Sequence, residues 1–271
     1  MSIAGTYAII YIAIDDSGNE ATFELVIRVR SDGTLELTAY YQSADGLWGE
    51  DLLLELRTIV NTGIVRQRYD AGNIILAETD RDPDNTGYLI TIYDRRSVLA
   101  TWDGGTTWNK EHVWPNSRLG VPRVDNADRN IASDLHNLRP ATPSVNSARG
   151  NKWYDTTTTT STYFPGDADK GDVARIILFM FMAYEGMQIV DVITVDTSTN
   201  YTPEGRYMAR FAVLLEWHLA DPVDDFERYR NEVIYGYQNN RNPFIDYPEF
   251  VEMIWGDIPT TSTNANQFYV N

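Results

Sequence analysis

The period of the hydrophobic pattern changes once along the chain, and this change constrains the fold more than any other feature. Apolar and polar side chains alternate over residues 22–29, which is typical of a strand with one wet face. A β-branched and aromatic run precedes it at residues 6–14, and Gly18 and Asn19 between the two runs suit positive φ. The sequence therefore predicts a β-hairpin within residues 1–35. Because a lone hairpin is marginally stable in water, this one needs a partner surface.

After the hairpin the pattern becomes helical. Apolar residues between Leu52 and Val60 form a stripe at helical spacing, and Gly63 suits the end of that helix. Three further helices are predicted, near residues 170–185, 206–219 and 223–238. Together with the strands discussed below, these helices predict an α+β domain over residues 36–271.

Three segments between the helices are predicted from local composition. Residues 88–94 have the apolar and aromatic character of a strand. The threonine-rich residues 156–162 suit a solvated loop. The aspartate-rich residues 80–85 lack the glycine and the distal glutamate of an EF-hand loop, so a turn is favoured over a calcium site.

Composition excludes several classes of protein. The chain has no cysteine, which excludes disulfides, thiolate metal sites and a cysteine nucleophile. No apolar run approaches the roughly 20 residues that cross a bilayer, and the longest, residues 176–183, suits a buried core helix. The first ten residues lack the basic region of a signal peptide. We therefore expect either a cytosolic protein or a chain from which a leader has been removed.

Positive charge is concentrated in one part of an acidic protein. Residues 110–152 contain seven lysines and arginines against four carboxylates, a local charge of +3. The whole chain carries −17, so the remainder carries −20. Such an island predicts one binding site for an anionic ligand, although the total charge opposes nucleic-acid binding by charge alone.

The island also holds the residues for phosphodiester hydrolysis. That reaction needs a base, a cation and groups that hold the phosphate. His112, one of only three histidines, is the natural base near neutral pH. Glu111 offers a carboxylate, and Asn137, Asn146 and Asn151 offer amide oxygens, which are ligands that a hard divalent cation prefers.

Four motifs in this region and beyond it resemble one family. "WNKEHVWPNS", "SDLHNLRP", "VNSARGN" and "RNEVIYGYQNNRNPF", in this order and spacing, resemble the endonuclease I family of nonspecific nucleases, in the ββα-metal or His-Me finger group. The resemblance runs from about Tyr40 to Trp255. It implies a core of two strands, bearing "EHVWP" and "HNLRP", and a helix that starts near "PSVNSARGN".

The resemblance also implies roles for particular residues. His112 would be the general base, and Glu111 and Asn146 would bind a single Mg²⁺ or another hard cation such as Mn²⁺ or Ca²⁺. An arginine between the two strands would steady the scissile phosphate, and the loop there offers three: Arg118, Arg123 and Arg129. The implied substrate is DNA, with RNA as a further possibility, cleaved with little sequence preference to leave 5′-phosphate ends.

The resemblance and the hairpin together bear on where the protein acts. The hairpin is similar to the last two strands of immunoglobulin-like repeats of bacterial surface and secreted proteins, and the alternative is an edge of the main domain. Both features favour a secreted protein. We also expect a monomer that has no membrane partner. Two other functions stay open: an inactive binding homologue that has lost the metal, and a carbohydrate-active protein that uses its tryptophans and paired acids.

Each candidate residue has a structural alternative. His112 could be a packed core histidine, Glu111 a surface carboxylate and Asn146 a helix N-cap. His136 is expected to support the second strand, and Arg175 either pairs with a buried carboxylate or reaches phosphate. "QNNRNPF" is favoured as a structural segment over a binding loop. Because adjacent strand residues point to opposite faces, we predict an irregular strand at Glu111 and His112.

Overall fold

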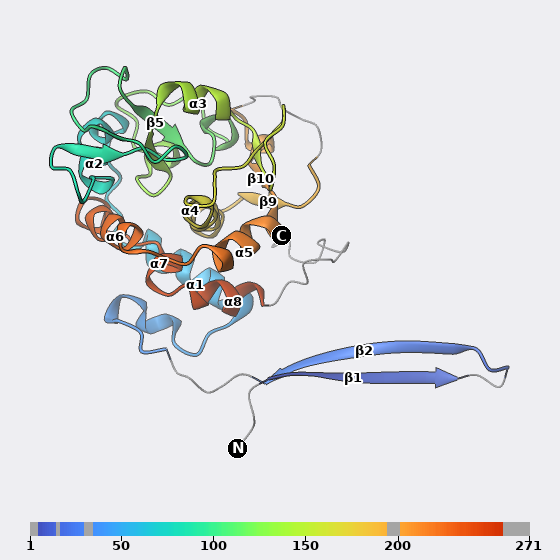
Figure 1. The fold of residues 1–271 in the computed structure, drawn as a ribbon. Coiled ribbons are helices and arrows are strands. Elements are labelled where there is room, and N and C mark those ends of the chain that lie inside the picture. Colours follow the sequence, from blue (N-terminus) through green and yellow to red (C-terminus); the bar gives the residue numbers. More distant parts are fainter. Residues whose placement is uncertain (1–4, 15–16, 30–34, 194–200, 257–271) are drawn as a thin grey trace. The chain divides into compact units, whose positions relative to one another are not determined.

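A computed structural model describes residues 5–14, 17–29, 35–193 and 201–256, with the backbone alone for 5–11 and 23–29. The chain divides into two compact units, Met1–Asp45 and Gly46–Asn271 (Figure 1). This division falls later in the chain than the predicted boundary after residue 35. No helix in the described part of the chain has the length and apolar character needed to cross a membrane.

The first unit is built on the predicted hairpin. Strands β1 (Gly5–Ile14) and β2 (Glu20–Val29) pair antiparallel over their whole length. Gly18 has a φ of +83° in the connection, a conformation that glycine adopts without a steric penalty. The 3₁₀ helix η1 (Ala39–Ala44) follows. The descent of this hairpin from an immunoglobulin-like repeat stays a prediction.

Helices dominate the second unit. The α-helices are α1 (Gly49–Asn61), α2 (Gly72–Thr79), α3 (Pro143–Arg149), α4 (Lys170–Ala183), α5 (Phe211–Ala220), α6 (Asp225–Gln238), α7 (Pro243–Asp246) and α8 (Glu249–Trp255). The apolar stripe of α1 is buried as predicted, and Gly63 takes a φ of +71° just beyond the helix. The helices predicted near 170–185 and 223–238 are confirmed as α4 and α6.

The strands of the second unit are short and paired two by two. They are β3 (Tyr88–Ile90), β4 (Ser97–Leu99), β5 (Asn109–His112), β6 (Leu138–Ala141), β7 (Trp153–Tyr154), β8 (Thr162–Tyr163), β9 (Gln188–Val190) and β10 (Tyr207–Ala209). The pairs β3–β4 and β5–β6 are antiparallel, and β7–β8 and β9–β10 are parallel. This mixture of helices and small sheets confirms the α+β class.

Three predicted elements differ from the structure. The strand predicted over 88–94 ends at Ile90, and residues 92–94 form a turn. The helix predicted over 206–219 begins only at Phe211, because residues 207–209 pair with β9 instead. The predicted loop over 156–162 is exposed at residues 156–160, but Thr162 is buried and pairs with Trp153. In the last two cases pairing with another strand overrides a local preference.

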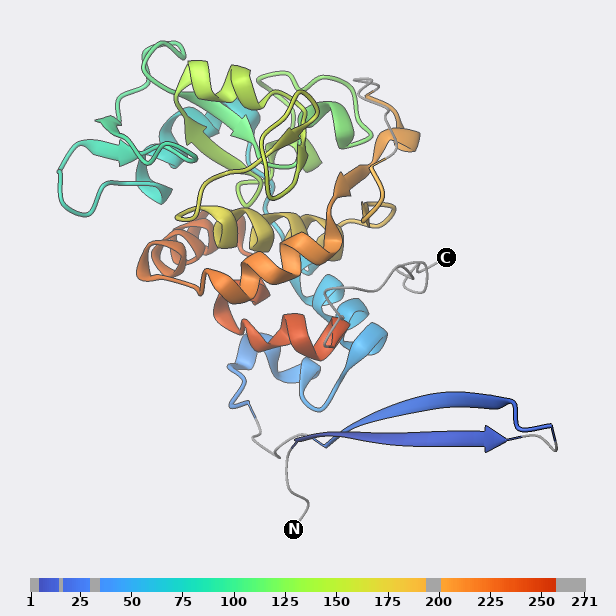
Figure 2. The same cartoon turned by 45° about the vertical axis from the view of Figure 1, so that its right-hand side comes forward.

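Helix α4 is the centre of the second unit. Nearly all of its residues are buried, including Arg175 and Asp172. Figures 1 and 2 show it between the part that contains β5 and α3 and the part that contains α1, α5, α7 and α8. The helix therefore separates the β5–β6 pair from most of the helical part.

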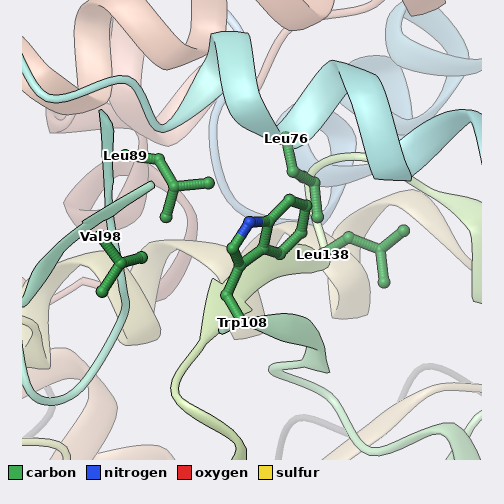
Figure 3. Packing of buried hydrophobic residues seen from close by; sticks show 5 residues of the cluster. All are labelled: Leu76, Leu89, Val98, Trp108 and Leu138. Carbon is green, nitrogen blue, oxygen red and sulfur yellow. The ribbon is translucent and has the colours of Figure 1, made fainter. Parts of the chain in front are cut away.

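A hydrophobic cluster fixes the position of the β5–β6 pair. It contains Leu76 from α2, Leu89 from β3, Val98 from β4, Trp108 and Leu138 (Figure 3). Trp108 immediately precedes β5, and Leu138 begins β6, so both strands are held by the same apolar contacts. Burial of each such side chain stabilises the fold by about 1.5–3 kcal/mol relative to exposure.

Candidate active site

Strands β5 and β6 and helix α3 form the framework of the candidate site. The strands pair antiparallel, with Glu111 opposite Arg139 and His112 opposite Leu138. Helix α3 begins two residues after β6. Pro143 stands in its first turn, where a backbone N–H would have no partner within the helix. The element order is the one that the resemblance implies.

Side chains of α3 fasten the helix to β5. Asn146 Nδ2 donates to Asn109 Oδ1 at 2.7 Å and lies 3.4 Å from the Lys110 carbonyl oxygen. Arg149 Nη1 donates to the His112 carbonyl oxygen at 3.1 Å. These contacts hold the helix that carries Asn146 against the strand that carries Glu111 and His112.

Strand β5 is regular, so the predicted irregularity at Glu111 and His112 is wrong. Pairing with β6 is maintained through His112, and the chain bends only at Val113 and Trp114, directly before Pro115. The restriction that proline places on the preceding residue therefore acts after the strand. As a consequence, Glu111 and His112 have separate surroundings.

His112 is held as a neutral proton acceptor. Its side chain is buried, and Nε2 lies 2.8 Å from the carbonyl oxygen of Ala132. Because a carbonyl oxygen only accepts, Nε2 carries the hydrogen and Nδ1 is the unprotonated nitrogen. Burial lowers the pKa of His112 to about 4, and the charges of Lys110 and Arg149 act in the same direction. The imidazole is therefore neutral near pH 7.

Glu111 lies in a different, polar environment. Its Oε1 accepts a hydrogen bond from the Tyr93 hydroxyl at 2.7 Å and lies 3.2 Å from Arg149 Nη1. The Tyr93 hydroxyl in turn lies 2.6 Å from that of Tyr154. Burial raises the pKa of Glu111, while Arg149 and Tyr93 oppose the shift. The buried carboxylate thus has a cationic neighbour that compensates part of its charge.

The amide oxygen of Asn146 is the second candidate ligand for a cation. The side-chain hydrogen bonds of Asn146 to Asn109 and Lys110 both use its amide nitrogen, and the Lys110 carbonyl, which can only accept, fixes this orientation. Among the described residues, no three histidine or carboxylate side chains gather as a multi-ligand metal site would need. A hard cation at this site would therefore depend on Glu111, an amide oxygen and water.

Asn137, another asparagine that the sequence offered as a ligand, is occupied elsewhere. It is fully buried, where its Oδ1 accepts from Trp114 N at 2.7 Å and its Nδ2 donates to the Trp114 carbonyl at 3.0 Å. These bonds stabilise the bend after β5. The backbone carbonyl of Asn151 accepts from Arg118. The side chain of Asn146, in contrast, is hydrogen-bonded to residues of β5.

Two of the three loop arginines are engaged in structural contacts. Arg118 is 2% exposed, donates from Nε to the Asn151 carbonyl at 3.1 Å and stacks 3.7 Å from the centre of the Trp153 ring. Arg129 is exposed and donates from Nη1 to the Arg66 carbonyl at 3.1 Å. Both contacts direct these guanidinium groups toward other parts of the chain.

Arg123 is the loop arginine whose charge reaches the surroundings of His112. Its side chain is exposed. Burial raises the pKa of Tyr69 to about 12, the charge of Glu111 adds to the shift, and the charge of Arg123 opposes it. The Tyr69 ring is stacked on the His112 ring. Tyr69 therefore lies within electrostatic reach of both Glu111 and Arg123.

Comparison with known proteins decides the family. The chain matches the Endonuclease I family over residues 49–164 and 158–249. It belongs to the endonuclease I family. An extracellular ribonuclease of Bacillus subtilis (strain 168) is 39% identical over 230 residues, covering 80% of this chain and 78% of the relative. An extracellular ribonuclease of Bacillus amyloliquefaciens is 34% identical over 258 residues, covering 90% and 87%. The protein is therefore a nuclease.

The remaining histidines of the nuclease have structural surroundings. His136 is buried against Phe179, with the ring centroids 4.3 Å apart. His218 Nε2 lies 3.2 Å from the carbonyl of Pro248, so it joins α5 to the start of α8. The surroundings of His136 agree with the supporting role expected from the sequence.

Two further motifs of the nuclease are also structural. Arg175 donates to both carboxylate oxygens of Glu227, at 2.7 and 2.6 Å. Of the two alternatives for Arg175, the structure therefore shows the buried carboxylate partner. In "QNNRNPF", Gln238, Asn240 and Asn242 are buried, and Asn242 donates to the carbonyl of Arg175 at 3.0 Å. The segment therefore fastens the C-terminal helices to α4.

Two tyrosines of the candidate site were not predicted from the sequence. Tyr69 contacts His112 and Tyr93 contacts Glu111, yet neither is part of the motifs that carry the resemblance. A tyrosine is an ordinary core residue, and these two lie far from residues 111–112 in the chain. The sequence contains no local signal that would have identified them.

Proposed function

We propose that this nuclease is an extracellular, metal-dependent endonuclease that hydrolyses RNA and DNA with little sequence preference. The observation that carries the proposal is the orientation of His112, whose Nε2 is bound to the Ala132 carbonyl while Nδ1 stays unprotonated. The names of both relatives support RNA as a substrate and secretion as the route to it. Membership of the endonuclease I family supports attack within a strand.

His112 would act as the general base. A water molecule gives its proton to Nδ1 and attacks the phosphorus, and the bond from phosphorus to the 3′ oxygen breaks. The 3′ oxygen leaves with a proton from solvent, and the phosphate stays on the 5′ end of the product. A base whose pKa lies below the working pH is present in its reactive form, and such a group contributes roughly 10²–10⁴-fold to the rate.

The carboxylate of Glu111 and the amide oxygen of Asn146 would hold the cation. These are hard oxygen donors, which fit Mg²⁺, Mn²⁺ or Ca²⁺. A bound cation would supply compensation for the charge on the phosphate oxygens. Arg149 and Tyr93 both contact Oε1 of Glu111 and so orient its carboxylate. The core would then be a ββα-metal, or His-Me finger, site.

Arg123 is our choice for the phosphate-binding arginine. Its side chain is exposed and its charge acts on Tyr69, whereas Arg118 and Arg129 have the contacts described above. Guanidinium binds phosphate through paired hydrogen bonds and does not distinguish bases. Cleavage with little sequence preference would follow from such contacts.

The test uses the purified protein with a labelled RNA and a supercoiled plasmid. We expect cleavage of both substrates with Mg²⁺, complete loss in excess chelator, recovery when Mg²⁺ is restored, and 5′-phosphate ends on all products. His112→Ala is the control for contaminating nucleases. Cleavage that survives full chelation would contradict the metal. RNA products with 2′,3′-cyclic phosphates would contradict the attack by water.

A further inference from the structure

Tyr69 makes a contact with the proposed base that the hydrolysis described above does not use. It begins the 3₁₀ helix η2 (Tyr69–Ala71), directly before α2. The centroids of the Tyr69 and His112 rings are 5.5 Å apart, and the two ring planes are inclined by 16°. The rings are therefore stacked nearly parallel, in an arrangement that restricts how the imidazole can turn.

The Tyr69 ring is itself held from several directions. It packs against the cluster that contains Trp108 and Leu138. The ammonium of Lys110, two residues before His112 on the same face of β5, lies 4.0 Å from the centre of the Tyr69 ring. Asn73 accepts a hydrogen bond from that ammonium. Tyr69 is therefore a fixed surface for the imidazole.

The backbone of Tyr69 also anchors the loop that carries Arg123. Tyr69 N donates to the Asp128 carbonyl at 3.0 Å, and Asp70 N donates to the Asn126 carbonyl at 3.0 Å. The segment that touches the base is thus hydrogen-bonded to the arginine loop. A displacement of Tyr69 would move both.

Two contacts together define the direction of His112 Nδ1. The hydrogen bond to Ala132 fixes the position of Nε2 but leaves the imidazole free to rotate about the line from Cβ to that atom. A parallel ring at stacking distance fixes the plane and removes this rotation. We propose that Tyr69 is a positioning residue for His112, whose ring, and not its hydroxyl, aims Nδ1 at the attacking water. This inference rests on the proposed role of His112 as the base.

The experiment compares Tyr69→Phe, which keeps the ring, with Tyr69→Leu, which removes it. We expect Tyr69→Phe to keep kcat within about threefold of wild type, and Tyr69→Leu to lose roughly 10–100-fold in kcat, with KM for DNA nearly unchanged, because small displacements of a reacting group have effects of this size. Trp102→Leu is the matched control. Trp102 also lies over the Lys110 ammonium, at 5.1 Å, and packs edge-on against Trp108, so its loss tests the packing around Lys110 while the Tyr69 ring stays on His112.

A second readout does not depend on activity. The chain has three histidines, so the imidazole proton resonance of His112 is assigned by its absence in His112→Ala. Stacking on Tyr69 shifts this resonance through the ring current. We expect the shift to persist in Tyr69→Phe and to disappear in Tyr69→Leu, while the resonances of His136 and His218 report that the fold is intact.

Several results would overturn the proposal. A tenfold or larger loss of kcat in Tyr69→Phe would assign the effect to the hydroxyl, and this arm remains decisive even when Tyr69→Leu does not fold. An unchanged rate in folded Tyr69→Leu would also overturn it. In the His112→Ala background, Tyr69→Leu should cause no further loss, and a full additional loss would show that Tyr69 acts independently of the base. Wild-type rate in His112→Ala itself would refute the base assignment, while the resonance would still report the stacking.

Discussion

Two groups of charged side chains next to the β5–β6 pair differ in their partners. In the candidate site, the buried carboxylate of Glu111 lies 3.2 Å from Arg149 Nη1, which also donates to the His112 carbonyl oxygen. Arg139, which pairs with Glu111 across the two strands, donates instead to Asp80 at 2.5 Å and to Asp172 at 3.0 Å. Two paired positions of the same sheet therefore have different charged partners.

The ion network around Arg139 continues with further buried pairs. Arg175 binds Glu227, and Arg230 lies 3.4 Å from Asp80. All of these side chains are nearly inaccessible to solvent. The difference between the two groups shows that arginine and aspartate side chains near the candidate site do not by themselves indicate function. What distinguishes a site is the presence of polar atoms that the fold leaves for a ligand.

The largest expected effect is the loss of activity when His112, in the candidate site, is replaced. His112→Ala should lower kcat per folded molecule by roughly 10²–10⁴-fold, because it removes the base. It should also lower the melting temperature, because the buried ring is lost together with its hydrogen bond to Ala132 and its contact with Tyr69. Initial rates on plasmid, together with thermal unfolding, measure both quantities. Retention of more than about a tenth of the wild-type rate would remove His112 from the role of base.

The reverse pattern is expected in the ion network. Arg175→Met should destabilise the protein by about 3–5 kcal/mol, because it leaves Glu227 buried without its partner, yet kcat per folded molecule should be unchanged. Denaturant unfolding and rates at low temperature test this. Burial raises the pKa of Glu227, so the destabilisation should shrink as pH falls and the carboxylate takes a proton. A loss of kcat without a loss of stability would break the comparison.

Ligand substitutions test which atoms the site leaves for a cation. Glu111→Gln and Asn146→Ala should each weaken Mg²⁺ binding by roughly 100-fold, since even outer partners of a metal site contribute 10–100-fold. Calorimetry measures the affinity, and activity should partly return at high Mg²⁺. Unchanged affinity in both variants would place the cation elsewhere.

The loop arginines give a smaller effect. Arg123→Ala should lower kcat by about tenfold at saturating substrate, as expected for the loss of one charge-assisted hydrogen bond to the reacting phosphate. Arg129→Ala is the matched control. It removes a positive charge from the same loop, but the Arg129 guanidinium donates to the Arg66 carbonyl. Equal losses in both variants would show a general effect of charge and not a contact with the scissile phosphate.

The smallest expected effect concerns acid stability. Burial lowers the pKa of His136 to about 4, against about 6.5 in an unfolded chain. Below pH 6.5 the unfolded state therefore binds the proton first, so this contribution to stability is intact above about pH 6.5 and is lost as pH falls toward 4. Glutamine does not titrate, so His136→Gln should reduce the slope of the unfolding free energy against pH by at most about 1.4 kcal/mol per pH unit. An identical slope in variant and wild type, measured by denaturant unfolding, would contradict it.

Much of the secondary structure follows from local patterns. Local patterns predicted three elements that the structure contains. They are the apolar stripe of α1, the apolar run of α4 and the alternation in the N-terminal hairpin. Strand β10 was not predictable in this way. Its residues became a strand only because β9 lies beside them.

The sequence by itself determined the family, the α+β class and the residues nominated for the reaction. His112, Glu111 and Asn146 lie within short motifs, and the spacing of a motif is a property of the chain alone. The resemblance therefore identified them without any knowledge of their surroundings, and their roles as base and ligands stay predictions.

The tertiary structure decided which of these groups have atoms left to use. The Ala132 carbonyl selects the tautomer of His112, Tyr69 stacks on its ring, and Trp153 covers Arg118. Each of these contacts joins residues from different elements, so it exists only once the chain has packed. Hydrogen bonding, burial and the pKa values that follow from them depend on such neighbours, and a list of residues does not contain them.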